Sequence, residues 1–379
     1  MLTIYRRLKA FWPENSLTIR ALNLLPAYSV YKETYAFLCR SRRWNREEHA
    51  AYQAEALSRL LDHAYENVPY YRRIFDDRGL VPGDIRTPAD LRLLPLLSRE
   101  DLQANLPDLC ARNYPESAFE YVTTGGSTGI PVGFYYEKGA SRAREWAFMK
   151  TQWDRVGYRF GDRCVVLRGY IVGSSHDAIY WKKALFGRWL LMSAYHMTEE
   201  ALLAYIREIR RFRPRFIQAY PSTAAILARY MVEHGVAPFP TVKAVLCGSE
   251  NLYPWQRDLL AEAFGCRVFS WYGNSEQTVL AGECEESTHY HIFPEYGVVE
   301  LDRAGWSTCG RTRRAGRDRC HQPHQLHLPT HPVSDDGSRH GGNRALHLRS
   351  ALSAARTRGR EAPGLHRDEQ SPTHLDDSG

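Results

Sequence analysis

Apolar residues recur every three or four positions in two stretches of the chain, residues 17–65 and 141–156. This spacing is typical of a helix that packs one face onto a core. The same pattern returns in residues 223–235 and 254–264. The sequence therefore predicts helices in all four stretches.

Three short apolar runs, residues 164–167, 216–220 and 242–246, have the length and composition of buried strands. They alternate with the predicted helices, which favours a parallel or mixed sheet covered by helical layers. The sequence thus predicts a protein of the α/β class, and it contains no internal repeat.

A loop rich in glycine and hydroxyl residues occupies residues 123–131, with the sequence TTGGSTGIP. Residues 121–122 lead into it as a strand and residues 132–136 lead out as another. Backbone N–H groups and small hydroxyls suit phosphate oxygens, so the loop is a candidate polyphosphate site. It is not a GxxxxGK[ST] loop, because no lysine follows. An ordinary Gly/Ser hairpin turn is the alternative.

This loop resembles the TSGSTGxP motif of adenylate-forming acyl ligases, with Gly125 where many members have serine. About 150 residues later, residues 272–276 (YGNSE) resemble the YGxTE motif of the same enzymes. Residues 70–80 and 94–102 resemble the lead-in of one branch, the phenylacetate-CoA ligase and CapK-like (coenzyme F390 synthetase-like) family. The resemblance runs from about residue 50 to 301.

The resemblance implies the large N-terminal domain of an adenylate-forming enzyme, with mixed sheets and helical layers. Residues 1–110 would be its helical lead-in and residues 111–302 its ATP-binding core. Residues 303–379 form an aberrant tail, for which we expect disorder, and the small C-terminal domain is missing.

The resemblance also assigns roles to single residues. Thr128 and Glu276 would be the catalytic residues and would position Mg²⁺, while Tyr272 would stack near adenine. The other nucleotide-binding residues implied are Thr124, Gly126, Ser127, Gly129, Ser249, Glu250, Gly273, Asn274 and Ser275. Taken alone, Glu276 could equally be a solvated loop acid and Tyr272 a core residue.

Cys284 and His291 form a possible half of a zinc site, with His289 between them. In the family, a Cys and a His at this place can join a later CxC pair. The chain has no such pair. A free cysteine beside surface histidines is the alternative interpretation.

The reaction implied is ATP-dependent adenylation of a carboxylic acid, followed by transfer of the acyl group to CoA. The adenylation lysine belongs to the small domain, and no lysine follows Lys243. We therefore expect impaired ligase activity in this polypeptide. Two alternatives remain: an acyl-adenylate donor in capsule or envelope polysaccharide synthesis without CoA, and a non-catalytic protein.

The sequence does not define the acyl substrate. Several aromatic residues could line an aromatic pocket, although aromatic residues at such spacing are more often part of a core. The candidates are Trp146, Phe148, Trp153, Tyr170, Tyr180, Trp181, Tyr195 and Tyr220.

The tail differs in composition from the rest of the chain. Residues 303–379 hold 13 arginines, 8 of the 15 histidines and 8 acidic residues, and no Phe, Tyr or Ile follows Tyr296. Such a segment cannot bury enough apolar surface to offset chain entropy. It also supplies +5 of the net charge of +7, so the basic balance does not indicate a nucleic-acid partner.

A reading frame displaced by one nucleotide explains the tail better than disorder alone. In that frame residues 316–339 can encode a segment resembling the one that carries the family's ribose-binding aspartate. Residues 345–350 can encode PCTCGR, which supplies the CxC pair for zinc, and residues 356–368 a further family block. A natural Arg/His-rich tail is the alternative. The slip would lie between residues 301 and 316.

The chain shows neither a signal peptide nor an apolar run of about 18 residues, so no transmembrane segment is expected. Its eight scattered cysteines fit a reducing compartment. We therefore expect a cytoplasmic protein; the sequence does not determine its oligomeric state.

Overall fold

The computed structural model describes residues 26–124, 132–170, 172, 180–185 and 187–300. The α-helices are α3 (Pro26–Ser41), α4 (Arg46–Asn67), α5 (Pro69–Asp77), α6 (Arg99–Ala104), α7 (Ser141–Asp154), α8 (Glu199–Phe212), α9 (Pro221–Glu233) and α10 (Pro254–Phe264). The short 3₁₀ helices are η1 (Pro82–Asp84), η2 (Pro88–Leu93) and η3 (Glu116–Ala118). The strands are β1 (Phe119–Thr123), β2 (Gly133–Glu137), β3 (Cys164–Arg168), β4 (Trp181–Ala184), β5 (Trp189–Ser193), β6 (Phe216–Ala219), β7 (Ala244–Cys247), β8 (Arg267–Gly273), β9 (Leu280–Gly282) and β10 (His291–Ile292).

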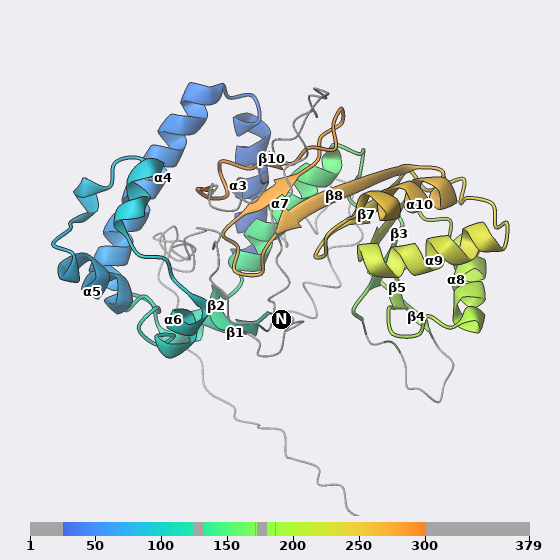
Figure 1. Cartoon of the computed structure of the whole chain (residues 1–379), viewed down its shortest axis with the longest axis horizontal. Helices are drawn as coiled ribbons and strands as arrows, with labels where there is room; N and C mark the ends of the chain where they lie inside the picture. Colours follow the sequence, from blue (N-terminus) through green and yellow to red (C-terminus); the bar gives the residue numbers. More distant parts are fainter. Residues whose placement is uncertain (1–25, 125–131, 171, 173–179, 186, 301–379) are drawn as a thin grey trace, which may run out of the picture.

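An eight-stranded mixed sheet forms the centre of the described structure, in the order β10-β9-β8-β7-β6-β3-β5-β4 (Figure 1). Strands β8, β7, β6, β3 and β5 run parallel, while β4 on one side and β9 and β10 on the other are antiparallel. Parallel strands are usually covered on both faces, which explains why their sequences are mostly apolar.

Alternate residues of β3 enter two different cores. Val165 and Leu167 pack with α8, α9 and α10 on one face of the sheet. Cys164 and Val166 pack on the other face with α7 and α3, which lie side by side (Figure 1). The sheet therefore has helices on both faces.

A third core joins α4 and α5 to the segments that follow them, and it includes Leu61, Phe75 and Val132. Val132 immediately precedes β2, which pairs with β1 in a separate antiparallel hairpin. The hairpin that carries the glycine-rich loop is thereby attached to the helical part of the molecule.

The predicted α/β class and the layers of helices are confirmed, but several boundaries were wrong. The predicted helical stretch of residues 17–65 contains two helices in its described part, because the Asn45 side chain accepts hydrogen bonds from Glu47 N and Glu48 N and starts α4 anew. Strand β7 begins at Ala244 rather than Val242, whose N–H is bound in a turn to the Phe239 carbonyl. Helix α9 begins at Pro221 rather than at residue 223, because proline is favoured in the first helical turn.

Residues 303–379 lie outside the described residues, so the expected disorder, the expected absence of a small domain and the proposed change of reading frame stay predictions. The domain limits at residues 110 and 302 stay predictions. Within the described part of the chain, no helix combines the length and apolarity needed to cross a bilayer.

Candidate nucleotide and acyl site

Several predicted site residues follow the carboxyl ends of neighbouring parallel strands. Tyr220 follows β6, residues 248–250 follow β7, and Tyr272 and Gly273 end β8. Arg168 ends β3, which lies beside β6. Carboxyl ends of parallel strands meet at one edge of a sheet, the usual place for a ligand in an α/β protein.

A cavity of about 310 Å³ opens at this edge, on the face of the sheet that α7 covers. Its lining consists of Trp146, Arg168, Gly169, Tyr170, Trp189, Gln218 and Tyr220. The Arg168 guanidinium lies 5.0 Å from the centroid of the Tyr220 ring and donates a hydrogen bond to Ser249 Oγ. The cavity therefore combines aromatic walls with one cation.

The cavity separates the aromatic candidates into two groups. Trp146, Tyr170 and Tyr220 line it, as an acyl pocket would require. Phe148 and Trp153 are core residues. Of the remaining candidates, Tyr180 and Trp181 pack against the α8 side, and Tyr195 is exposed, with its hydroxyl near Gly169.

The loop after β7 is shaped by a close approach of its backbone to Trp271. A Cβ atom on Gly248 would lie 2.3 Å from the Trp271 ring, so only glycine fits. Ser249 has a left-handed backbone, with φ of 69°, and its hydroxyl accepts the Arg168 hydrogen bond. Ser249 thus connects this loop to the cavity.

The Glu250 carboxylate is directed to the start of α9. It accepts hydrogen bonds from Ser222 N at 3.0 Å and Ser222 Oγ at 2.9 Å. A carboxylate at a helix N-terminus is stabilised by the unpaired N–H groups there. Glu250 therefore joins two of the segments that build the site.

The turn over residues 272–276 is held by its own side chains. Asn274 Oδ1 accepts a hydrogen bond from Thr278 N at 3.0 Å, and Asn274 Nδ2 donates to Thr278 Oγ1 at 2.6 Å. Gln277, at φ 56°, donates from its amide to the Ser141 carbonyl at the start of α7. Asn274 therefore fixes the shape of the turn that presents Glu276.

The same turn contacts the glycine-rich hairpin. The Tyr136 hydroxyl on β2 donates a hydrogen bond to the Ser275 carbonyl. At the other end of the hairpin, Thr124 N donates to the Val132 carbonyl, and Thr124 Oγ1 accepts from Val132 N at 3.0 Å. Gly126, Ser127, Thr128 and Gly129 lie outside the described residues, so their assigned roles stay predictions.

Glu276 is half-buried and forms no ion pair with any described residue. Burial, followed by the charge of Glu276, raises the pKa of Tyr272. Burial and then Glu145 raise the pKa of Tyr136 to about 12, with Glu276 contributing and Arg142 opposing. Because the Glu276 carboxylate is not paired with a cationic side chain of the described residues, it suits Mg²⁺, which prefers oxygen ligands.

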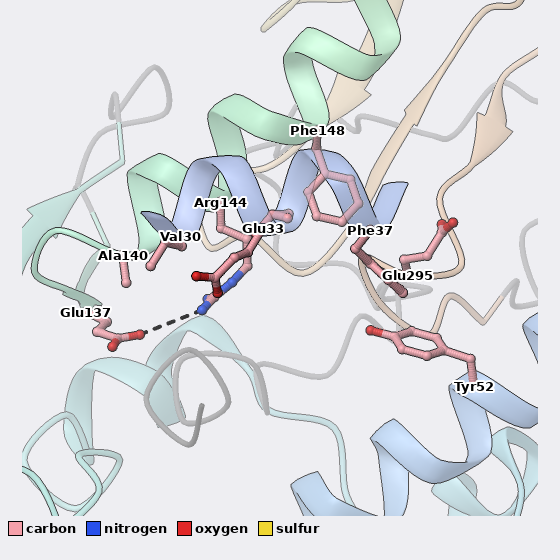
Figure 2. Close-up of a pocket in the computed structure, with 10 residues that line it drawn as sticks. Val30, Glu33, Phe37, Tyr52, Glu137, Ala140, Arg144, Phe148 and Glu295 are labelled. Carbon is pink, nitrogen blue, oxygen red and sulfur yellow. Dashed lines mark ion pairs between the residues drawn. The ribbon is translucent and has the colours of Figure 1, made fainter. Parts of the chain in front are cut away.

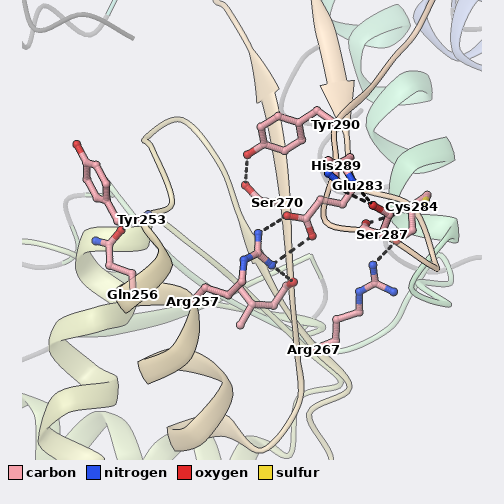
Figure 3. A network of polar contacts seen from close by, with 11 residues as sticks. Tyr253, Gln256, Arg257, Arg267, Ser270, Glu283, Cys284, Ser287, His289 and Tyr290 are labelled. Carbon is pink, nitrogen blue, oxygen red and sulfur yellow. Dashed lines mark hydrogen bonds and ion pairs between the residues drawn. The ribbon is translucent and has the colours of Figure 1, made fainter. Parts of the chain in front are cut away.

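The residues that follow β9 form a polar network with side chains of α10 and β8, rather than a metal site (Figure 3). Glu283 is fully buried and pairs with Arg257 of α10, while the Ser270 hydroxyl lies 2.7 Å from the Tyr290 hydroxyl. Burial raises the pKa of Glu283, and Arg257 opposes this.

Cys284 and His291 follow in this region. Burial, then Arg155 and His289, lowers the pKa of His291. No three His, Cys, Asp or Glu residues of the described chain are grouped to hold a metal. A structural zinc ion needs four ligands, so these two residues do not suffice.

A second cavity, of about 280 Å³, lies between α3, α4 and α7 (Figure 2). Its one arginine, Arg144, is already paired with Glu137 at 3.9 Å. Of the predicted site residues only the aromatic candidate Phe148 lines it, and no predicted nucleotide-binding or metal-binding residue among those described does, so the cavity at the strand ends is the better candidate.

Sequence reasoning missed Arg168, Gln218 and Trp189 as lining residues. The predicted strand ended at Leu167. Arg168, a charged residue directly after this apolar strand, could have indicated a ligand-binding position at the strand end. Trp189 lies in strand β5, which was not predicted.

No family model matches the chain. It is 30% identical over 261 residues to the phenylacetate-coenzyme A ligase of Escherichia coli, covering 66% of this chain and 58% of that protein. It is 28% identical over 261 residues to the corresponding ligase of Aromatoleum evansii, and the match covers 66% of this chain and 58% of that protein. It is 25% identical over 240 residues to protein CapK of Staphylococcus aureus, and the match covers 62% of this chain and 52% of CapK.

The chain thus spans little more than half the length of the relatives it matches. Among solved structures, 2-hydroxyisobutyryl-CoA ligase, in complex with 2-HIB-AMP and CoA, has a similar fold. The TM-score is 0.50 at 20% identity, over 65% of this chain and 54% of the other. Motif blocks, sheet and relatives agree: the chain is similar in sequence to phenylacetate-CoA ligases and to CapK over about two thirds of its length.

Proposed function

We propose that the chain is the nucleotide- and acid-binding part of an enzyme that activates a carboxylic acid with ATP and passes the acyl group to CoA. The observation that carries this proposal is the hydrogen bond from Tyr136 to the Ser275 carbonyl. It holds the hairpin of the glycine-rich loop against the turn that presents Glu276, although the two blocks lie about 150 residues apart in the sequence.

In the first step an oxygen of the substrate carboxylate attacks the α-phosphorus of ATP, and pyrophosphate leaves. Two anions must approach each other, so the site has to neutralise charge and hold both reactants in line. Glu276 and Thr128 would bind Mg²⁺, which would offset the charge of the phosphates. Thr124 closes the hairpin whose loop would surround these phosphates.

Tyr272 and the 248–250 loop would flank the adenine ring, and the cavity at the strand ends would take the acyl group. In the second step the CoA sulfur attacks the acyl carbon, the bond to AMP breaks, and the thiol proton is released. The solved ligase that shares this fold is in complex with an acyl adenylate and CoA, which supports this order of events. Zinc has no part in the proposal for the described residues.

Calorimetric titration of the full chain with ATP and Mg²⁺ tests the proposal. We expect binding, and we expect Glu276→Gln to weaken it about tenfold or more, because a charged ligand of the metal is lost. Glu262→Gln, at an exposed position on α10, is the matched control and should bind like the wild type. Equal affinity of the wild type and Glu276→Gln would contradict the role of Glu276, and no binding at all would contradict the proposed function.

A further inference from the structure

The cavity at the strand ends holds a cation that has no counter-ion in the described structure. Arg168 is half-buried, and no carboxylate of a described residue lies within ion-pair distance of it. Its contacts are the Ser249 hydroxyl and the face of the Tyr220 ring, both of which are uncharged. A guanidinium has five N–H donors in a fixed planar fork, so donors remain for a ligand.

The same cavity is lined by an amide. Gln218 is 7% exposed, and no hydrogen bond joins its side chain to another described residue. An amide offers both an N–H donor and a carbonyl acceptor. Its place in the wall of the cavity leaves these groups available to a polar group of the ligand.

The two side chains lie on one face of the sheet. Gln218 is opposite Val166 in the parallel pairing of β6 and β3, and Arg168 is two residues beyond Val166. Residues two apart on a strand face the same side, and diagonal neighbours on adjacent strands are about 7–8 Å apart. One carboxylate between them can accept from both the guanidinium and the amide.

The remaining walls of the cavity, Trp146, Trp189 and Tyr170, suit a carbon skeleton. We propose that the acyl substrate is a dicarboxylic acid, whose second carboxylate is bound between Arg168 and Gln218 while the first is activated. This rests on the proposed function, since it assumes that the cavity takes the acyl group. The contacts with Ser249 and Tyr220 hold the guanidinium in place before the substrate binds.

Binding to the full chain, in the presence of AMP, can be compared for two matched pairs of acids. Phenylacetate is paired with 4-carboxyphenylacetate, and butanoate with pentanedioate. We expect the diacid of at least one pair to bind about tenfold or more tighter than its monoacid, as a charge-assisted hydrogen-bonded pair should provide. Arg168→Met should abolish this preference, and Arg168→Lys should retain part of it.

Gln218→Leu should weaken diacid binding several-fold. Arg229→Met, which removes one positive charge from an exposed position on α9, should change neither affinity. Thermal melts of each variant report whether it is folded; if Arg168→Met unfolds, Arg168→Lys and Gln218→Leu decide the question.

The results distinguish this inference from the function on which it rests. Monoacid binding without a diacid preference, or a preference that survives in Arg168→Met, overturns the inference alone. Equal weakening of both acids in Arg168→Met also overturns it, because Arg168 would then bind the reacting carboxylate. If neither acid of either pair binds although ATP and Mg²⁺ do, the inference fails and the proposed function stands; if ATP and Mg²⁺ do not bind either, the proposed function fails with it.

Discussion

Gly248 is a tightly constrained residue in the loop after β7. Its α-carbon faces the Trp271 ring, where an added Cβ would approach to 2.3 Å. We expect Gly248→Ala to lower the free energy of unfolding by about 1–3 kcal/mol, because ring and loop must move apart. Since Ser249 would move too, its contact with Arg168 should be lost.

Urea unfolding measures this effect. Gly83→Ala is the matched control, because a Cβ there meets nothing within 4 Å. A stability loss at Gly248 no larger than at Gly83 would show that the loop adapts easily.

Residues carried by motifs could be predicted from the sequence, whereas residues brought together by the sheet could not. Glu276 and Tyr272 belong to one short block that is recognisable by itself. Arg168 and Gln218 are 50 residues apart in the sequence, and only the pairing of β3 with β6 makes them neighbours. Neither has a local pattern that marks it as part of a cavity.

Helix α9 depends on a residue from a different element for its first turn. Its N-cap, Tyr220, has no side-chain capping bond, and Glu250 binds Ser222 N instead. We expect Glu250→Ala to lower the free energy of unfolding by about 1–2 kcal/mol, the usual cost of a lost cap with its dipole interaction. Chemical denaturation checks this, with Glu262→Ala as the control on an exposed helix face.

If Glu250→Ala leaves stability unchanged, Glu250 is not needed to start the helix.

The existence of most helices was predictable because their apolar spacing is regular. Their ends were less predictable, since residues 42–45 separate α3 from α4 without interrupting the apolar spacing. Strand β4 carries two lysines, a pattern typical of a sheet edge, which explains why apolar runs did not reveal it.

For the whole molecule, the composition of residues 303–379 leads to a prediction about the gene. We expect the nucleotide sequence between codons 301 and 316 to open a second frame that encodes the family blocks described above. A protein with that frame restored should release pyrophosphate and form thioester at least about 10²-fold faster than the chain as it stands, because the lysine and the CxC pair would return.

Sequencing the coding DNA and assaying both proteins on the same acids would check this. An intact gene without such a frame, or equal rates for the two proteins, would favour a natural Arg/His-rich tail instead.

The glycine-rich hairpin and the turn of Glu276 lie far apart along the chain, and this separation also sets the order in which the parts of the site can form during synthesis. At roughly 5–20 residues per second, the ribosome needs about 8–30 s to travel from the glycine-rich hairpin to the turn of Glu276. During that time Tyr136 has no Ser275 carbonyl to bind, and a two-stranded hairpin alone is only marginally stable in water. The nascent hairpin must therefore rely on its attachment to the α4 and α5 core through Val132. Substitutions in that distant core would then reduce the yield of folded protein made in cells more than they reduce the stability of protein already folded.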